Sequence, residues 1–210
     1  MKTILTAVML LAAAGWAEAT LVDQTFTVSG GTIADGNPVG QVFTGNFTAA
    51  ATGNQVLGIT VNLNVSGGYN GNLYAYLVAP NGTLVLLLNR PGAGSGNPMG
   101  YAGSGFNNIT LSDVGTQSIQ TTVEPPGVAV TGTYNAAGTL GTFNGSVANG
   151  QWELFFADMM KGGGTSTLTS WSLNITVVPE PVTLALGMFA IMLLALAALR
   201  RLWRPNNPLN

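Results

Sequence analysis

Few side chains in this sequence could do acid–base or nucleophilic chemistry. The 210 residues include no histidine and no cysteine. A serine nucleophile of the protease type needs a general-base histidine, and a cysteine nucleophile needs its own thiol. Zinc sites lose their usual ligands for the same reason. Two carboxylates, Glu153 and Asp158, remain as the nearest acid–base pair.

The spacing of these two carboxylates argues against shared chemistry. They are five positions apart in a segment with the periodicity of a strand. Side chains five apart on a strand point to opposite faces, whereas two catalytic carboxylates must flank one substrate. We therefore predict that the chain is not an enzyme.

The elements around these residues read as strands, because apolar residues recur with a period of two. The turn Pro80-Asn81-Gly82 joins two of the predicted strands into a hairpin. Short strands with glycine-rich turns are typical of a β-sandwich, so the predicted class is all-β. The predicted strands are Ile59 to Val65, Asn72 to Ala79, Leu84 to Leu88, Phe106 to Leu111, Gln151 to Ala157 and Ser170 to Val177. Residues 20–55 are left as an N-terminal extension, with a candidate edge strand at Gln24 to Val28.

Aromatic residues divide between the two faces of the predicted strands. Trp152 and Trp171 fall at inward positions, and Tyr74 and Tyr76 share the outer face of one strand. Exposed aromatic faces stack on sugars, so the two tyrosines are candidate ligand-stacking residues. The alternative is that they pack across the sheet and cover its outer face.

Charged residues make up 7% of the chain, against roughly 25% in ordinary globular proteins. Between residues 20 and 177 the only cations are Arg90 and Lys161. Two cations cannot neutralise a phosphate backbone, so nucleic acid is excluded as a partner.

Several short segments together resemble a known family. In chain order they are Gly71-Asn72-Leu73, Ala79 to Thr83, Phe106 to Asp113 (FNNITLSD), Gly150 to Leu154 (GQWEL) and Leu168 to Leu173 (LTSWSL). Their order and spacing are similar to the P domain (P/Homo B) of kexin- and furin-like subtilisin proteases, over residues 56–177. The resemblance implies a jelly-roll-like β-sandwich that accompanies a protease domain without containing its catalytic residues.

The P-domain resemblance also implies calcium as a possible cofactor. Asp113 and Asp158 are the matching acidic positions, but the family's aspartate in G-D-L is Asn72 here. Carboxylate and carbonyl oxygens suit Ca²⁺. The alternative is that both aspartates cap turns through their side-chain oxygens.

The C-terminal segment carries a second resemblance. Pro179-Glu180-Pro181 precedes an uncharged run from Val182 to Leu199, and a cluster of Arg200, Arg201 and Arg204 follows. At about 1.5 Å per residue the run would extend about 27 Å as a helix, so we expect a transmembrane helix over 182–199 with residues 205–210 in the cytoplasm. The three parts in this order resemble the PEP-CTERM sorting signal of Gram-negative bacteria, over residues 178–204. Exosortase would cleave such a tail and release the protein from the inner membrane to the cell surface.

The N-terminus is predicted to be a signal peptide over residues 1–19. Lys2 precedes a short apolar stretch, and Ala17-Glu18-Ala19 forms a site for signal peptidase.

The combined prediction is an exported, non-catalytic module that passes through the inner membrane once and then binds exopolysaccharide or a protein at the cell surface. The alternative is an accessory P domain that assists a separate subtilisin-like protease.

Overall fold

A computed structural model describes residues 20–48, 54–179 and 181–202. Within these ranges, only the backbone is described for residues 20–30, 54, 178–179, 181–186 and 200–202. Residues 19–178 form one compact unit, and the helix that follows belongs to another.

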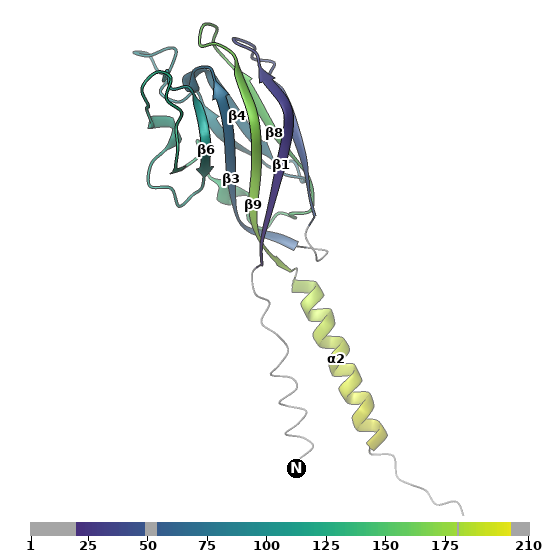
Figure 1. Ribbon diagram of the computed structural model, residues 1–210. Helices are drawn as coiled ribbons and strands as arrows, with labels where there is room; N and C mark the ends of the chain where they lie inside the picture. Colours follow the sequence, from purple (N-terminus) through teal and green to yellow (C-terminus); the bar gives the residue numbers. More distant parts are fainter. Residues whose placement is uncertain (1–19, 49–53, 180, 203–210) are drawn as a thin grey trace, which may run out of the picture. The chain divides into compact units, whose positions relative to one another are not determined.

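The compact unit is built from two β-sheets (Figure 1). The pairs β1–β9, β2–β8, β3–β6, β4–β5 and β4–β8 are antiparallel, and the short pair β6–β7 is parallel. One sheet, in the order β1-β9-β3-β6-β7, comprises Thr20–Ile33, Ser166–Pro179, Asn54–Gly67, Gly105–Leu111 and Thr133–Tyr134. The other, in the order β2-β8-β4-β5, comprises Gln41–Phe47, Gly150–Asp158, Leu73–Val78 and Leu84–Asn89. The described part of the chain is therefore mostly β, and the two sheets are consistent with the predicted β-sandwich.

The N-terminal extension contributes a strand to each sheet. β1 lies at an edge and pairs with β9, and β2 lies at the edge of the other sheet and pairs with β8. The candidate strand at Gln24 to Val28 is part of β1. β2 was not predicted, although its buried Phe43 and Phe47 alternate with exposed residues.

The core lies between the sheets and collects the inward positions of the predicted strands. Trp152, Leu154 and Phe156 of β8 are fully buried, as predicted from their alternation. Trp171 is buried in β9. β8 lies between β2 and β4 and buries these three large side chains in the core. The hydrophobic effect therefore holds the register of the four-stranded sheet.

A bulge interrupts the predicted strand from Phe106 to Leu111. Leu63 pairs with Ile109 and Val65 with Phe106, so Asn107 and Asn108 oppose a single residue of β3. Asn108 has a φ of 50°, a conformation that asparagine adopts more readily than most residues.

Three short 3₁₀-helices close the ends of the sandwich: η1 (Asn70–Asn72), η2 (Ile119–Thr121) and η3 (Leu140–Phe143). Phe143 of η3 meets the ring of Trp152 edge-on, with 5.2 Å between ring centroids. η3 is therefore fixed to the core by an aromatic contact.

Helix α2 spans Pro181–Leu202 and starts at the proline that the sequence pattern indicated. We expected a transmembrane helix over residues 182–199. Over the residues that the structure describes, however, no helix is both long enough and apolar enough to cross a membrane. The expected transmembrane span over residues 182–199 is therefore not supported by the structure.

Candidate functional site

Asp158 ends strand β8 and is fully buried. Its Oδ1 accepts hydrogen bonds from the backbone N–H groups of Gly36 (3.2 Å) and Met160 (3.1 Å). The bond from Met160, two residues along the chain, is the Asx-turn geometry. Oδ2 is buried without a hydrogen-bond partner. Asp158 therefore caps a turn with one oxygen and leaves the other unsatisfied.

Asn72 leaves a second unsatisfied oxygen close to Asp158. It lies in η1, is fully buried, and donates from Nδ2 to the carbonyl oxygen of Met160 at 2.9 Å. Its Oδ1 is buried without a partner. Asn72 thus bonds the backbone carbonyl of Met160, and Asp158 bonds the backbone N–H of the same residue. A buried oxygen without a protein partner costs about 1–3 kcal/mol, so these two oxygens are candidates to bind a ligand, a water or a proton.

Burial raises the pKa of the Asp158 carboxyl above its ordinary value of 3.8, because the charged form loses its hydration. The hydrogen bonds from Met160 and Gly36 oppose this pKa shift. The charge of Asp35 raises the pKa further, and the guanidinium of Arg90 lowers it. The environment therefore favours the protonated acid more than water does.

Asp113 follows strand β6 and caps η3 from outside that helix. Its Oδ1 accepts from the N–H of Leu140 (2.8 Å) and its Oδ2 from the N–H of Gly141 (2.6 Å). These are N–H groups that the short helix cannot satisfy internally. Both oxygens are thus engaged, which favours the turn-capping alternative for Asp113.

The two aspartates predicted as metal ligands lie at opposite ends of the sandwich. Asp113 borders residues 57–60 near the start of β3, whereas Asp158 pairs with Leu73, which follows the end of β3. The nine residues of β3 from Ile59 to Gly67, which are eight steps of about 3.3 Å, extend roughly 26 Å. One ion therefore cannot bind both. Among the described residues, no three acidic side chains gather where they could hold a metal ion.

Glu153 does not join Asp158 in an acid–base pair. Glu153 is half-buried at an outward position of β8, between the buried Trp152 and Leu154, whereas Asp158 is enclosed at the end of the strand. The two carboxylates therefore diverge, as their spacing in the sequence predicted.

Tyr74 and Tyr76 lie half-buried on the outer face of β4 and form a cluster with Phe155 of β8. The rings of Tyr76 and Phe155 are stacked, with 4.5 Å between centroids and 11° between planes. Tyr74 meets both rings edge-on, at 6.2 Å from Tyr76 and 6.5 Å from Phe155. One face of the Tyr76 ring is therefore covered, as the cross-strand packing alternative expects. Val42 and Leu84, each about half exposed, extend this aromatic cluster across β2 and β5.

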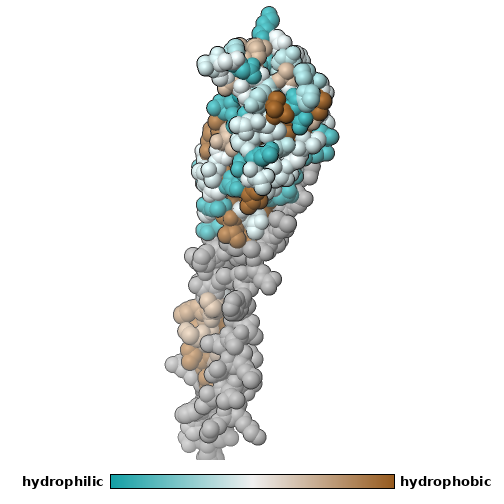
Figure 2. All heavy atoms as spheres, turned by 90° about the vertical axis from the view of Figure 1, so that its left-hand side faces the viewer, coloured by the Kyte–Doolittle hydropathy of each residue, from teal (hydrophilic) through white to brown (hydrophobic). Residues whose placement is uncertain are grey.

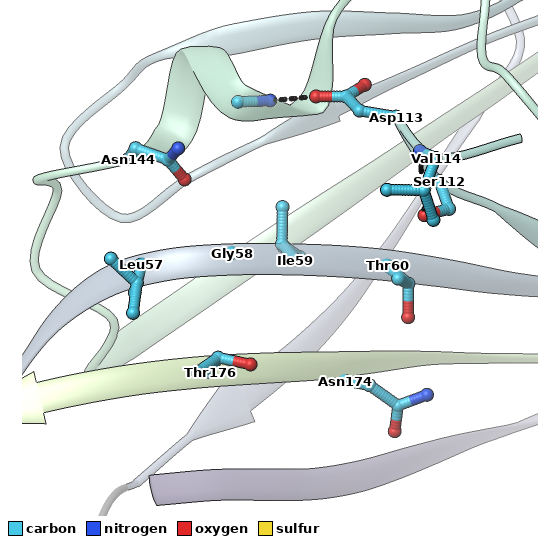
Figure 3. A pocket seen from close by; sticks show the side chains of 11 residues that line it. Leu57, Gly58, Ile59, Thr60, Ser112, Asp113, Val114, Asn144, Asn174 and Thr176 are labelled. Atoms are coloured by element: carbon cyan, nitrogen blue, oxygen red, sulfur yellow. Dashed lines mark hydrogen bonds between the residues drawn. The ribbon is translucent and has the colours of Figure 1, made fainter. Parts of the chain in front are cut away.

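A groove of about 610 Å³ lies on the other sheet (Figure 3). β3 and β9 form its floor, with Thr60, Asn174 and Thr176 among the lining residues. Residues 112–114 and η3 form its wall, and Asn144 stands at the end of η3. Sequence reasoning found the polar alternation of β3 but not the groove, because its wall comes from segments without periodicity.

The surface is weakly polar elsewhere. On the face drawn in Figure 2, apolar side chains of the sandwich occur in small separate groups among neutral and polar residues.

The predicted processing signals lie largely outside the described residues. Ala17, Ala19, Glu180 and Arg204 are not described, and the structure gives only the backbone of Pro179, Pro181, Arg200 and Arg201.

Comparison with known proteins finds one family. The family model described as the proprotein convertase P-domain matches residues 56–175. No curated protein matches the chain.

Two solved structures are similar. The serine protease of Aeromonas sobria in complex with its chaperone ORF2 is 20% identical, with a TM-score of 0.47, and the match covers 82% of this chain and 29% of that one. The same protease solved alone is 21% identical, with a TM-score of 0.47 and coverages of 80% and 29%. The chain thus spans under a third of the length of these proteases.

The buried carboxyl of Asp158 gives a pH prediction for the chain in a chelator. Its raised pKa means that the native state holds the proton more tightly, so stability falls as pH rises from about 3.8 through the folded pKa. Asp158→Asn keeps an acceptor for Gly36 and Met160 but does not ionise. Urea unfolding at several pH values should show the variant gaining stability relative to the parent across this interval.

Asp158→Ala is the matched control, because it leaves the two N–H groups without their acceptor. Relative to Asp158→Asn, which also does not ionise, it should cost about 1–3 kcal/mol of unfolding free energy at each pH. A parent that gains stability over Asp158→Asn as pH rises would contradict the inferred direction of the shift.

Proposed function

We propose that this chain, which belongs to the proprotein convertase P-domain family, is an exported, non-catalytic module that binds a polysaccharide or a protein at the cell surface. Its sandwich would act as a recognition scaffold, with ligand contacts made by the outward side chains of the sheets.

The lack of catalytic side chains supports this proposal. The sequence has no histidine and no cysteine, and its nearest carboxylate pair, Glu153 and Asp158, diverges. An acid–base mechanism needs groups within hydrogen-bond reach of one substrate. The geometry therefore favours binding over turnover.

The observation that carries the proposal is the difference between the two outer sheet faces. One bears Tyr74, Tyr76 and Phe155 as a packed cluster, and the other bears asparagine and threonine around the groove of Figure 3. The volume of this groove lies within the range of ligand pockets, which supports a binding role.

The aromatic cluster supports a second candidate, the accessory role in proteolysis. Aromatic residues with half-exposed Val42 and Leu84 beside them fit a protein surface better than a hydrophilic chain. In this candidate the cluster docks onto a separate subtilisin-like catalytic chain.

Co-purification distinguishes the two candidates. An affinity tag inserted at Gly82, in an exposed turn with open space around it, leaves both faces accessible. We expect the tagged full-length chain to be retained with extracellular polysaccharide and to be released by glycosidase treatment. Retention of a secreted serine protease, lost in Tyr74→Ser/Tyr76→Ser and unaffected by glycosidase, would favour the accessory role and contradict the first candidate.

Calcium at Asp158 is a further part of the proposal. The unsatisfied Asp158 Oδ2 and Asn72 Oδ1 are oxygen atoms of the kind that calcium prefers as ligands, which supports the proposal; backbone carbonyls and waters would have to supply the remaining ligands. Bound calcium would neutralise the buried carboxylate and fix the turn at Met160. Asp113 is left out because both its oxygens accept backbone N–H groups.

A titration after chelator treatment tests the calcium proposal. Adding Ca²⁺ should raise the melting temperature of the parent, by the equivalent of about 2.7 kcal/mol at 100 times Kd. Asp158→Asn should lose this rise, and Asp113→Asn, as the control, should keep it. An equal rise in Asp158→Asn, or none in the parent, would reject calcium at this position.

We also propose that residues 178–204 are a sorting signal cut by exosortase and that signal peptidase cuts after Ala19. The order of Pro179-Glu180-Pro181, an apolar run and the arginine cluster supports the first cut. The intact mass of the surface protein should correspond to a chain that starts at Thr20 and ends near Pro181. A surface protein that keeps residues 182–199 would contradict processing by exosortase.

A further inference from the structure

We infer that the outer face of β9, β3 and β6 binds an uncharged polysaccharide strand, with the groove of Figure 3 as its main subsite. The inference rests on the proposed polysaccharide-binding function and assigns it a place and a ligand class.

The described lining of the groove holds one carboxylate and no cation. Among the residues whose side chains the structure describes, Asp113 is the only ionisable one that lines the groove, and both of its carboxylate oxygens already accept backbone N–H groups of η3. The two cations between residues 20 and 177 are remote: Arg90 acts on Asp158, and Lys161 lies against Gly36, both at the opposite end of β3. An anionic ligand would find no cationic partner among these side chains, and the carboxylate of Asp113 is already hydrogen-bonded, so the groove suits a neutral ligand best.

The lining chemistry matches hydroxyl groups. Thr60 and Thr176 offer hydroxyls, and Asn144 offers an amide, so each can both donate and accept a hydrogen bond. Sugar hydroxyls have the same double capacity. Leu57 is 53% exposed and Val114 85% exposed at the same groove, where they can contact the C–H surface of a sugar ring.

A second hollow continues the surface along β3. It measures about 280 Å³ and lies on the same strands. Its polar lining residues are Asn62, Asn64, Asn108, Thr110, Ser170 and Ser172. Thr110 Oγ1 donates to Asn62 Oδ1 at 2.8 Å, which fixes that amide before any ligand arrives. The bulge at Asn108 places a further amide here.

The two hollows follow the direction of one strand. Thr60 belongs to the first and Asn62 and Asn64 to the second, so at about 3.3 Å per residue they lie roughly 7–13 Å apart. Two subsites in line on an open face suit an extended chain of repeating units better than a single small molecule. Each subsite adds to the affinity of the other, because both belong to one ligand.

The tyrosine pair is a poorer sugar platform than the sequence suggested. The ring of Tyr76 is stacked on Phe155, and Tyr74 meets both rings edge-on. The three rings thus pack against one another. The sugar-binding surface is therefore assigned to the amide- and hydroxyl-bearing face of the other sheet.

Affinity electrophoresis of the full-length chain tests the assignment. The gels contain a neutral glucan, mannan or galactan, or anionic alginate for comparison. We expect retardation by at least one neutral polysaccharide and none by alginate. Thr60→Val/Thr176→Val removes two hydroxyls while keeping side-chain shape, and it should weaken binding about 10-fold, since each lost hydrogen bond is worth about 3-fold or more.

Two controls keep the outcomes distinct. Thr44→Val makes the same change at an exposed position of β2 on the other sheet and should bind like the parent. Melting temperatures confirm that each variant folds. If Tyr74→Ser/Tyr76→Ser abolishes retardation and Thr60→Val/Thr176→Val does not, the groove assignment is wrong and the proposed function stands. If no neutral polysaccharide retards the chain, or alginate alone does, the inference fails; retardation by none of the polysaccharides removes the polysaccharide function as well.

Discussion

The burial of alternate side chains of β8 is the constraint on which the rest of this structure depends. Trp152, Leu154 and Phe156 have no exposed surface, and they face a core shared by both sheets. Burial of each large apolar side chain is worth roughly 1.5–3 kcal/mol, so one strand supplies much of the driving force. Trp152 also connects the core to the surface, because it packs against Phe143, and Phe143 belongs to the helix η3 that Asp113 caps. The wall of the groove is thereby tied to the core.

The inward side chains of the strands fill the core, so ligand recognition depends on the outward side chains. The outward side chains differ between the two sheets. The chain has few charges, so its surface chemistry depends on amides, hydroxyls and aromatic rings. On the four-stranded sheet the aromatic rings of Tyr74, Tyr76 and Phe155 pack against one another. On the five-stranded sheet asparagine and threonine line the two hollows. At the far end, Asn72 and Asp158 leave two buried oxygens without partners, a cost that a bound cation or a proton would offset.

Period-two patterning was enough to predict most of the strands and the inward tryptophans. It missed β2 and the full length of β1, although Asp35-Gly36 and Asn37-Pro38 between them are turn signals. The bulge at Asn108 was also missed, because a positive φ leaves no trace in hydrophobic periodicity. Buried amides are harder still. The side chain of Asn70 donates a hydrogen bond to the carbonyl of Gly105 and accepts one from its N–H. This side chain therefore continues the hydrogen-bond ladder of a strand. Nothing in the composition of the sequence distinguishes Asn70 from a surface asparagine. The sites were predicted least well, because ring contacts and groove walls depend on segments far apart in the sequence.

The central claim is that the polar sheet face, and not the aromatic one, is the binding surface. NMR of the isotope-labelled full-length chain, titrated with the neutral polysaccharide that it binds best, tests this most directly. The account predicts that signals of Thr60, Asn144 and Thr176 shift on titration while those of Tyr74, Tyr76 and Phe155 stay in place. Shifts confined to the aromatic cluster would contradict it.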